Sequence, residues 1–87
     1  MKLIFAIVRD TDDSAVINAL VNNEFRVTRM ASTGGFLRRG MVTLMIGTEE
    51  NKIQNALDLI KQSCQPPEEG QHRATVFVVN AAHYEQI

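Results

Sequence analysis

The order of apolar and polar residues along the chain predicts four strands. Apolar residues run almost without interruption over residues 2–8, which is the pattern of a strand buried on both faces. Residues 41–46 and 74–79 form two further apolar runs of the same kind. Over residues 25–31 apolar and polar positions alternate, and this pattern predicts a strand with two unlike faces.

A first helix is expected to begin at residues 10–14, Asp-Thr-Asp-Asp-Ser. Asp or Thr can cap free backbone N–H groups there, and acidic residues in a first turn complement the helix dipole. We interpret these carboxylates as helix-start residues and not as a metal site. Asn22 and Asn23 suit the helix end, because Asn tolerates left-handed backbone geometry. The predicted buried stripe consists of Val16, Ile17, Leu20 and Val21.

A second helix is expected to be capped by Thr48 and stopped by Pro66-Pro67. A polar loop, residues 65–73, follows it, and the tail at residues 81–87 fits either a helical turn or a segment folded over the sheet. Because Cys64 lies on the apolar face, we expect a buried structural thiol and not a nucleophile. That face consists of Ile53, Ala56, Leu57, Ile60 and Cys64.

The resulting order of strand, helix, strand, strand, helix, strand predicts an α+β sandwich of the ferredoxin-like kind (βαββαβ). At 87 residues the chain is expected to form a single domain, residues 1–87. The first and third strands should be central, with both helices on one face of the sheet. The other face is also apolar, so a second copy of the chain should cover it, and we expect a homo-oligomer.

Composition excludes several classes of function. A net charge of −1 argues against binding of a nucleic acid polymer, which needs a basic face. No run is long enough to span a membrane, and a single cysteine suits the reducing cytoplasm. His72 and His83 lack the spacing of a metal site, no catalytic set of residues is evident, and no cofactor is expected. We therefore expect a protein that is not an enzyme.

Residues 25–40 carry the strongest chemical signal. Arg26 and Thr28 fall on one face of the predicted strand, where a forked guanidinium and a hydroxyl can meet a phosphate. Gly34-Gly35 then frees the backbone N–H groups near Phe36 for close approach to an anion. A cation, a hydroxyl, bare backbone and an aromatic ring together suit a nucleotide. The alternative is an ordinary hairpin connection with a solvated Arg38-Arg39 tip.

Two positions outside this stretch add to the same interpretation. Gly47 would leave room for a ring, and Phe36 or Phe77 can supply an apolar or stacking wall. Phe77 is equally consistent with plain core packing. Leu37 is equally consistent with a hairpin residue that contacts a neighbouring subunit.

Residues 28–40 read Thr-x-x-Ala-Ser-Thr-Gly-Gly-Phe-Leu-Arg-x-Gly, which resembles the signature of the PII-like cyclic-di-AMP receptor family of bacteria. Further similarity covers residues 6–8, Phe25-Arg26, Thr28, Gly47 and residues 74–78. The resemblance implies a homotrimer with its sheets facing inward and ligand sites at subunit boundaries. The ligand-binding residues that it implies are Arg26, Thr28, Gly35, Phe36, Leu37, Gly47, Phe77 and Gln86.

The chain departs from the family pattern at three places. Glu24 stands where Asn is frequent, Met41 stands where a polar residue such as Asn is frequent, and the loop at residues 65–73 is short. The function expected is a non-catalytic cytoplasmic signalling protein that binds cyclic-di-AMP and reports it to a protein partner. The alternatives are a PII-like sensor of another adenine nucleotide and a ligand-free trimeric adaptor that docks a protein partner.

Overall fold

The fold is seen in a computed structural model that describes residues 1–30 and 40–87. Strands and helices follow one another in the predicted order, and the strand bounds lie within two residues of those expected. The second α-helix begins at Ile53, several residues after the start that a Thr48 cap predicts. A short 3-10 helix precedes the second α-helix. The elements are β1 (Lys2–Arg9), α1 (Asp13–Asn22), β2 (Arg26–Met30), β3 (Met41–Thr48), η1 (Glu50–Lys52), α2 (Ile53–Ser63) and β4 (Ala74–Asn80).

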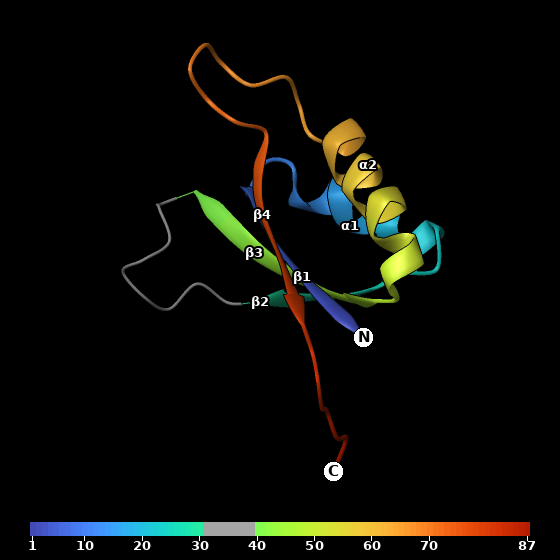
Figure 1. Ribbon diagram of the computed structural model, residues 1–87. Coiled ribbons are helices and arrows are strands. Elements are labelled where there is room, and N and C mark those ends of the chain that lie inside the picture. Colours follow the sequence, from blue (N-terminus) through green and yellow to red (C-terminus); the bar gives the residue numbers. More distant parts are fainter. Residues whose placement is uncertain (31–39) are drawn as a thin grey trace.

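The four strands form one antiparallel sheet in the order β2-β3-β1-β4. The first and third strands are therefore central, as predicted, and β2 and β4 are the edges. Both helices cover the same face of the sheet (Figure 1). The predicted α+β architecture with two helices on one face is confirmed.

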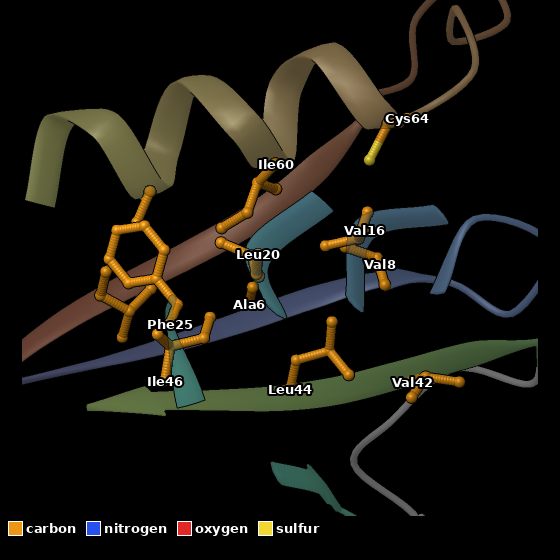
Figure 2. Packing of buried hydrophobic residues seen from close by; sticks show 12 residues of the cluster. Ala6, Val8, Val16, Leu20, Phe25, Val42, Leu44, Ile46, Ile60 and Cys64 are labelled. Atoms are coloured by element: carbon orange, nitrogen blue, oxygen red, sulfur yellow. The ribbon is translucent and has the colours of Figure 1, made fainter. Parts of the chain in front are cut away.

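A single apolar core fills the space between the sheet and the helices (Figure 2). The central strands supply alternate residues to it, and each helix supplies one stripe. Val21 was predicted in the stripe of α1, but it is 53% exposed and only its neighbours Val16 and Leu20 are buried. The core residues are Ile4, Ala6, Val8, Val16, Leu20, Phe25, Val42, Leu44, Ile46, Ala56, Ile60 and Cys64.

The end of α1 forms a Schellman motif centred on Glu24. The Phe25 N–H donates to the Leu20 carbonyl and the Glu24 N–H to the Val21 carbonyl, both at 3.0 Å. Leu20 and Phe25 are both buried, which is the hydrophobic contact that accompanies this motif. The left-handed position is Glu24, with φ of 70°, and not one of the two asparagines that precede it.

The predicted cap of the second helix is wrong. Thr48 is the last residue of β3 and pairs with Lys2 of β1. Its hydroxyl donates to the Glu49 carbonyl at 3.4 Å, and the chain then passes through η1 before α2 begins. Strand pairing therefore determines the conformation of Thr48, and Glu49 takes the N-cap position of η1 without a side-chain cap.

Asp12 joins the end of β1 to the end of α2 and does not cap α1 through its side chain. Its carboxylate is 1% exposed and accepts from Arg9 Nε at 3.0 Å and from the Gln65 N–H at 3.2 Å. Arg9 Nη2 also donates to the Gln65 carbonyl at 2.6 Å. We refer to Arg9, Asp12 and Gln65 as the polar clamp. It fixes the point where α2 ends and the loop at residues 65–73 begins.

The tail at residues 81–87 forms neither a helix nor a strand and extends away from the sheet (Figure 1). Its start is tied down, because the Ala81 N–H donates to the Met1 carbonyl at 3.0 Å. Within residues 1–30 and 40–87, no helix is both long and apolar enough to cross a membrane.

Candidate functional site

Both helices cover one face of the sheet (Figure 1), and we call the other face the open face. Side chains alternate along each strand, so cross-strand partners on this face follow from the register. They form three rows. The rows are Arg26–Gly47–Leu3–Val79, Thr28–Met45–Phe5–Phe77 and Met30–Thr43–Ile7–Thr75.

Arg26 and Thr28 share the open face at the β2 edge, as the alternation predicted. Both side chains are exposed. Arg29 points to the other face, where its Nε lies 2.8 Å from Asp13 Oδ2. Among the described residues no carboxylate lies within salt-bridge distance of Arg26. Its guanidinium is therefore a charge on the open face with no partner among those residues, and it can meet an anion.

Gly47 is the direct cross-strand partner of Arg26. A Cβ added at Gly47 would lie 2.7 Å from Met1 Cε, so the terminal methyl of Met1 occupies the space beside the glycine. A ring bound over Gly47 must contact or displace that methyl. Three predicted site residues, Arg26, Thr28 and Gly47, are thus brought together at one corner of the open face.

Phe77 lies on the same face but on the opposite edge strand. It is 55% exposed and takes no part in the core, so core packing within one chain does not account for it. β2 and β4 are three strand spacings apart, which is about 14 Å. The structure therefore does not bring Phe77 to Arg26 within one chain.

The remaining predicted residues are not joined to this corner by any described contact. Gln86 is exposed in the extended tail. That tail follows Asn80, which pairs with Lys2 at the end of the sheet where the Arg26 row lies. Gly35, Phe36 and Leu37 lie outside the described residues.

A hollow in the described part of the chain lies elsewhere, at the carboxyl end of α2. It measures about 640 Å³ and contains none of the predicted site residues. Cys64 borders it, and burial, with the nearby Asp12 carboxylate, raises the pKa of this thiol above its ordinary value of 9.0. A thiol that stays protonated at neutral pH is a poor nucleophile. The hollow's other lining residues are Asp58, Lys61, Gln62, Ser63, Gln65, Pro66 and Arg73.

Two features of the open-face corner were not predicted from the sequence. Met45 is the cross-strand partner of Thr28, and Met1 lies against Gly47. Alternation along residues 41–46 does place Met45 on one of the two faces. Its pairing with Thr28, however, depends on the register between two strands that are separated by a loop.

The comparisons with known proteins cover the whole chain. The sequence model of a family described as "Cyclic-di-AMP receptor" matches residues 1–87. A crystal structure of a protein from Pediococcus pentosaceus ATCC 25745, described as functionally unknown, is similar in fold, with a TM-score of 0.79 and 33% identity. The match covers 99% of this chain and 96% of that one.

Proposed function

Because the chain belongs to the cyclic-di-AMP receptor family, we propose that it is a non-catalytic cytoplasmic signalling protein that binds cyclic-di-AMP between the subunits of a homotrimer. The observation that supports the ligand most directly is the corner formed by Arg26, Thr28 and Gly47. A cyclic dinucleotide carries two phosphates and two purine rings. The Arg26 guanidinium, which has no carboxylate partner among the described residues, suits a phosphate, and the neighbouring hydroxyl adds a hydrogen bond.

The separation of Arg26 from Phe77 supports a site shared by two subunits. One subunit would supply Arg26 and Thr28 from its β2 edge, and its neighbour would supply Phe77 from its β4 edge. The tail that carries Gln86 extends away from its own sheet, so it too can reach a neighbouring subunit (Figure 1). In a closed trimer each boundary repeats this arrangement, which gives three equivalent sites.

The apolar character of the open face supports the assembly. Phe77 is 55% exposed and Val79 is 45% exposed, and both lie on an edge strand whose outer backbone groups are unpaired in the sheet. Large apolar side chains on one continuous face are a liability for a lone domain of this size. Packing against a second and third copy would cover them.

A thermal-shift screen with a panel of nucleotides tests the ligand. A ligand present at 100 times its dissociation constant adds about 2.7 kcal/mol to the free energy of unfolding. For a domain of this size that raises Tm by about 10 °C or more. We expect cyclic-di-AMP to give this shift, and inorganic phosphate, the control that has charge but no ring, to give little.

The same panel separates the alternatives. A larger shift with ATP or AMP than with cyclic-di-AMP would favour a sensor of another adenine nucleotide. No shift with any nucleotide would favour a ligand-free adaptor that docks a protein partner, and would contradict the proposal.

A further inference from the structure

Methionines are distributed unevenly between the two faces of the sheet. The chain has four, and all of them lie on or against the open face. Met30 and Met45 belong to its rows, Met41 shares their alternation on the strands, and Met1 reaches it beside Gly47. The core beneath the helices contains none, and is built mainly from branched aliphatic side chains. The open face thus carries flexible thioethers among its other residues, whereas the core does not.

Two of these methionines flank the candidate phosphate ligands. Met45 pairs with Thr28 across the strands, and the Met1 methyl lies over Gly47, the partner of Arg26. Met45 lies on β3, and the Met1 methyl lies beside Gly47 of the same strand. β3 is one strand spacing, about 4.8 Å, inward from β2. Met45 and Met1 are the first apolar groups that a molecule held at Arg26 meets if it extends over the sheet.

The chemistry of a thioether suits the flat face of a purine. Methionine is unbranched and polarizable, and its sulfur makes favourable contacts with aromatic rings. It has three rotatable bonds, so it adapts to a ring that arrives or leaves. A thioether makes only weak hydrogen bonds, and such a surface holds the ring without reading the hydrogen-bonding edge of the base.

We propose that Met1 and Met45 form the floor of the nucleotide site and contact the face of a purine ring. This inference rests on the proposed function, because it takes a phosphate at Arg26 as its starting point. It also gives Gly47 a role, since a Cβ there would lie 2.7 Å from Met1 Cε and the Met1 methyl would have to move. The rival occupant of this floor is a neighbouring subunit.

Methionine methyl NMR tests this floor directly. Protein labelled with ¹³C at the methionine methyl groups gives four signals, one for each methionine. Met→Leu variants at positions 30, 41 and 45 assign three of them, and the fourth belongs to Met1. On titration with cyclic-di-AMP we expect the Met1 and Met45 methyl signals to move upfield, because they lie beneath an aromatic ring. Inorganic phosphate, which has no ring, should not move them upfield.

Calorimetry on the same samples distinguishes a failure of the methionine floor from a failure of the proposed cyclic-di-AMP binding. If cyclic-di-AMP binds to saturation and the Met1 and Met45 signals stay in place, the floor is covered by something other than the base and the inference is overturned. If cyclic-di-AMP gives no heat and moves no signal, the proposed function itself fails, and the inference fails with it.

Met45→Leu provides a second readout, because it keeps the volume and removes the sulfur. We expect its affinity for cyclic-di-AMP to fall by about two- to tenfold. Val21→Leu is the control, since Val21 is an exposed apolar residue of α1 on the helix side of the sheet, and it should bind within about twofold of the natural protein. A Met45→Leu protein that binds as tightly as the Val21→Leu control overturns the thioether contact.

Discussion

Among the residues that the structure describes, Glu24 is the only one other than glycine with a positive φ. It occupies the position after a helix where glycine is preferred and Asn is sometimes found, because a Cβ is strained in left-handed geometry. Glu24 stands where Asn is frequent in the family pattern, and it places a negative charge near a proposed site for an anionic ligand. In the structure the backbone of Glu24 is also strained, with φ of 70°.

Charge and strain at Glu24 can be separated by two substitutions. Glu24→Asn removes the charge and relieves the left-handed strain, so we expect it to raise the free energy of unfolding by about 1 kcal/mol. Glu24→Gln removes the same charge and keeps the strain, so its unfolding should match the natural protein within about 0.5 kcal/mol. Thermal denaturation of both proteins checks this. Equal stabilisation by the two substitutions would show that the charge, and not the backbone, is responsible.

The same two substitutions at Glu24 also test whether its charge affects the binding of cyclic-di-AMP. If Glu24 repels a dianion, Glu24→Gln should tighten cyclic-di-AMP binding by at most about tenfold at low salt, and the gain should shrink as salt rises. Weaker binding by Glu24→Gln without any dependence on salt would show instead that the carboxylate accepts a hydrogen bond from a base.

At the scale of whole elements, the apolar pattern was sufficient for the order of strands and helices and for most of the residues they bury, with the exposed Val21 as an exception. It was insufficient wherever tertiary pairing competes with a local signal. Thr48 has the side chain of a helix cap, yet it pairs with Lys2 as the last residue of β3. Asp12 likewise looks like a cap, and its side chain instead binds Gln65 from a distant element.

In the candidate site, too, the local pattern predicted some features, and others depend on how the strands pair. The alternation of residues 25–31 correctly placed Arg26 and Thr28 on one face. It could not show that Gly47 faces Arg26, because that pairing depends on the register between the two strands. The position of Met1 beside Gly47 depends on a side chain reaching across strands and has no signal in the local sequence.

The polar clamp predicts that Asp12→Asn, a small change in side-chain size, lowers the free energy of unfolding strongly. Asp12→Asn removes the charge opposite Arg9 and turns an acceptor oxygen into a donor inside a buried network, so we expect a loss of about 2–4 kcal/mol in the free energy of unfolding. Asp10→Asn is the control, because Asp10 is exposed and its described hydrogen bond to Gly40 uses the backbone. It should change stability by about 0.5 kcal/mol or less.

Chemical denaturation at one fixed protein concentration compares these two variants, since assembly makes stability depend on concentration. Equal losses for Asp12→Asn and Asp10→Asn would mean that the clamp contributes nothing specific.

At the scale of the whole molecule, the proposal is a trimer of about 29 kDa, from three chains of 9.7 kDa, with each site divided between two subunits. Subunit mixing tests the division. Arg26→Ala and Phe77→Ala should each weaken cyclic-di-AMP binding when pure. In trimers reassembled from an equal mixture, about a quarter of the boundaries join an intact Arg26 to an intact Phe77 of the neighbour.

We therefore expect the mixture to recover tight binding in about that fraction of sites, measured by calorimetry after subunit exchange. Light scattering on the same samples confirms the mass of the assembly. A mixture that binds no better than its parts would contradict the division of each site between two subunits. A stable monomer of 9.7 kDa at micromolar concentration would contradict the trimer.

The most direct test of the central claim, that Arg26 on the open face binds a cyclic-di-AMP phosphate, is a calorimetric titration of three proteins. Arg29 lies on the same strand but points to the helices and pairs with Asp13, so Arg29→Ala is the matched control for Arg26→Ala. We predict that Arg26→Ala loses at least about 2 kcal/mol of binding free energy, or about 30-fold in affinity, while Arg29→Ala binds within about twofold of the natural protein. Equal affinity of Arg26→Ala and the natural protein for cyclic-di-AMP would contradict the account.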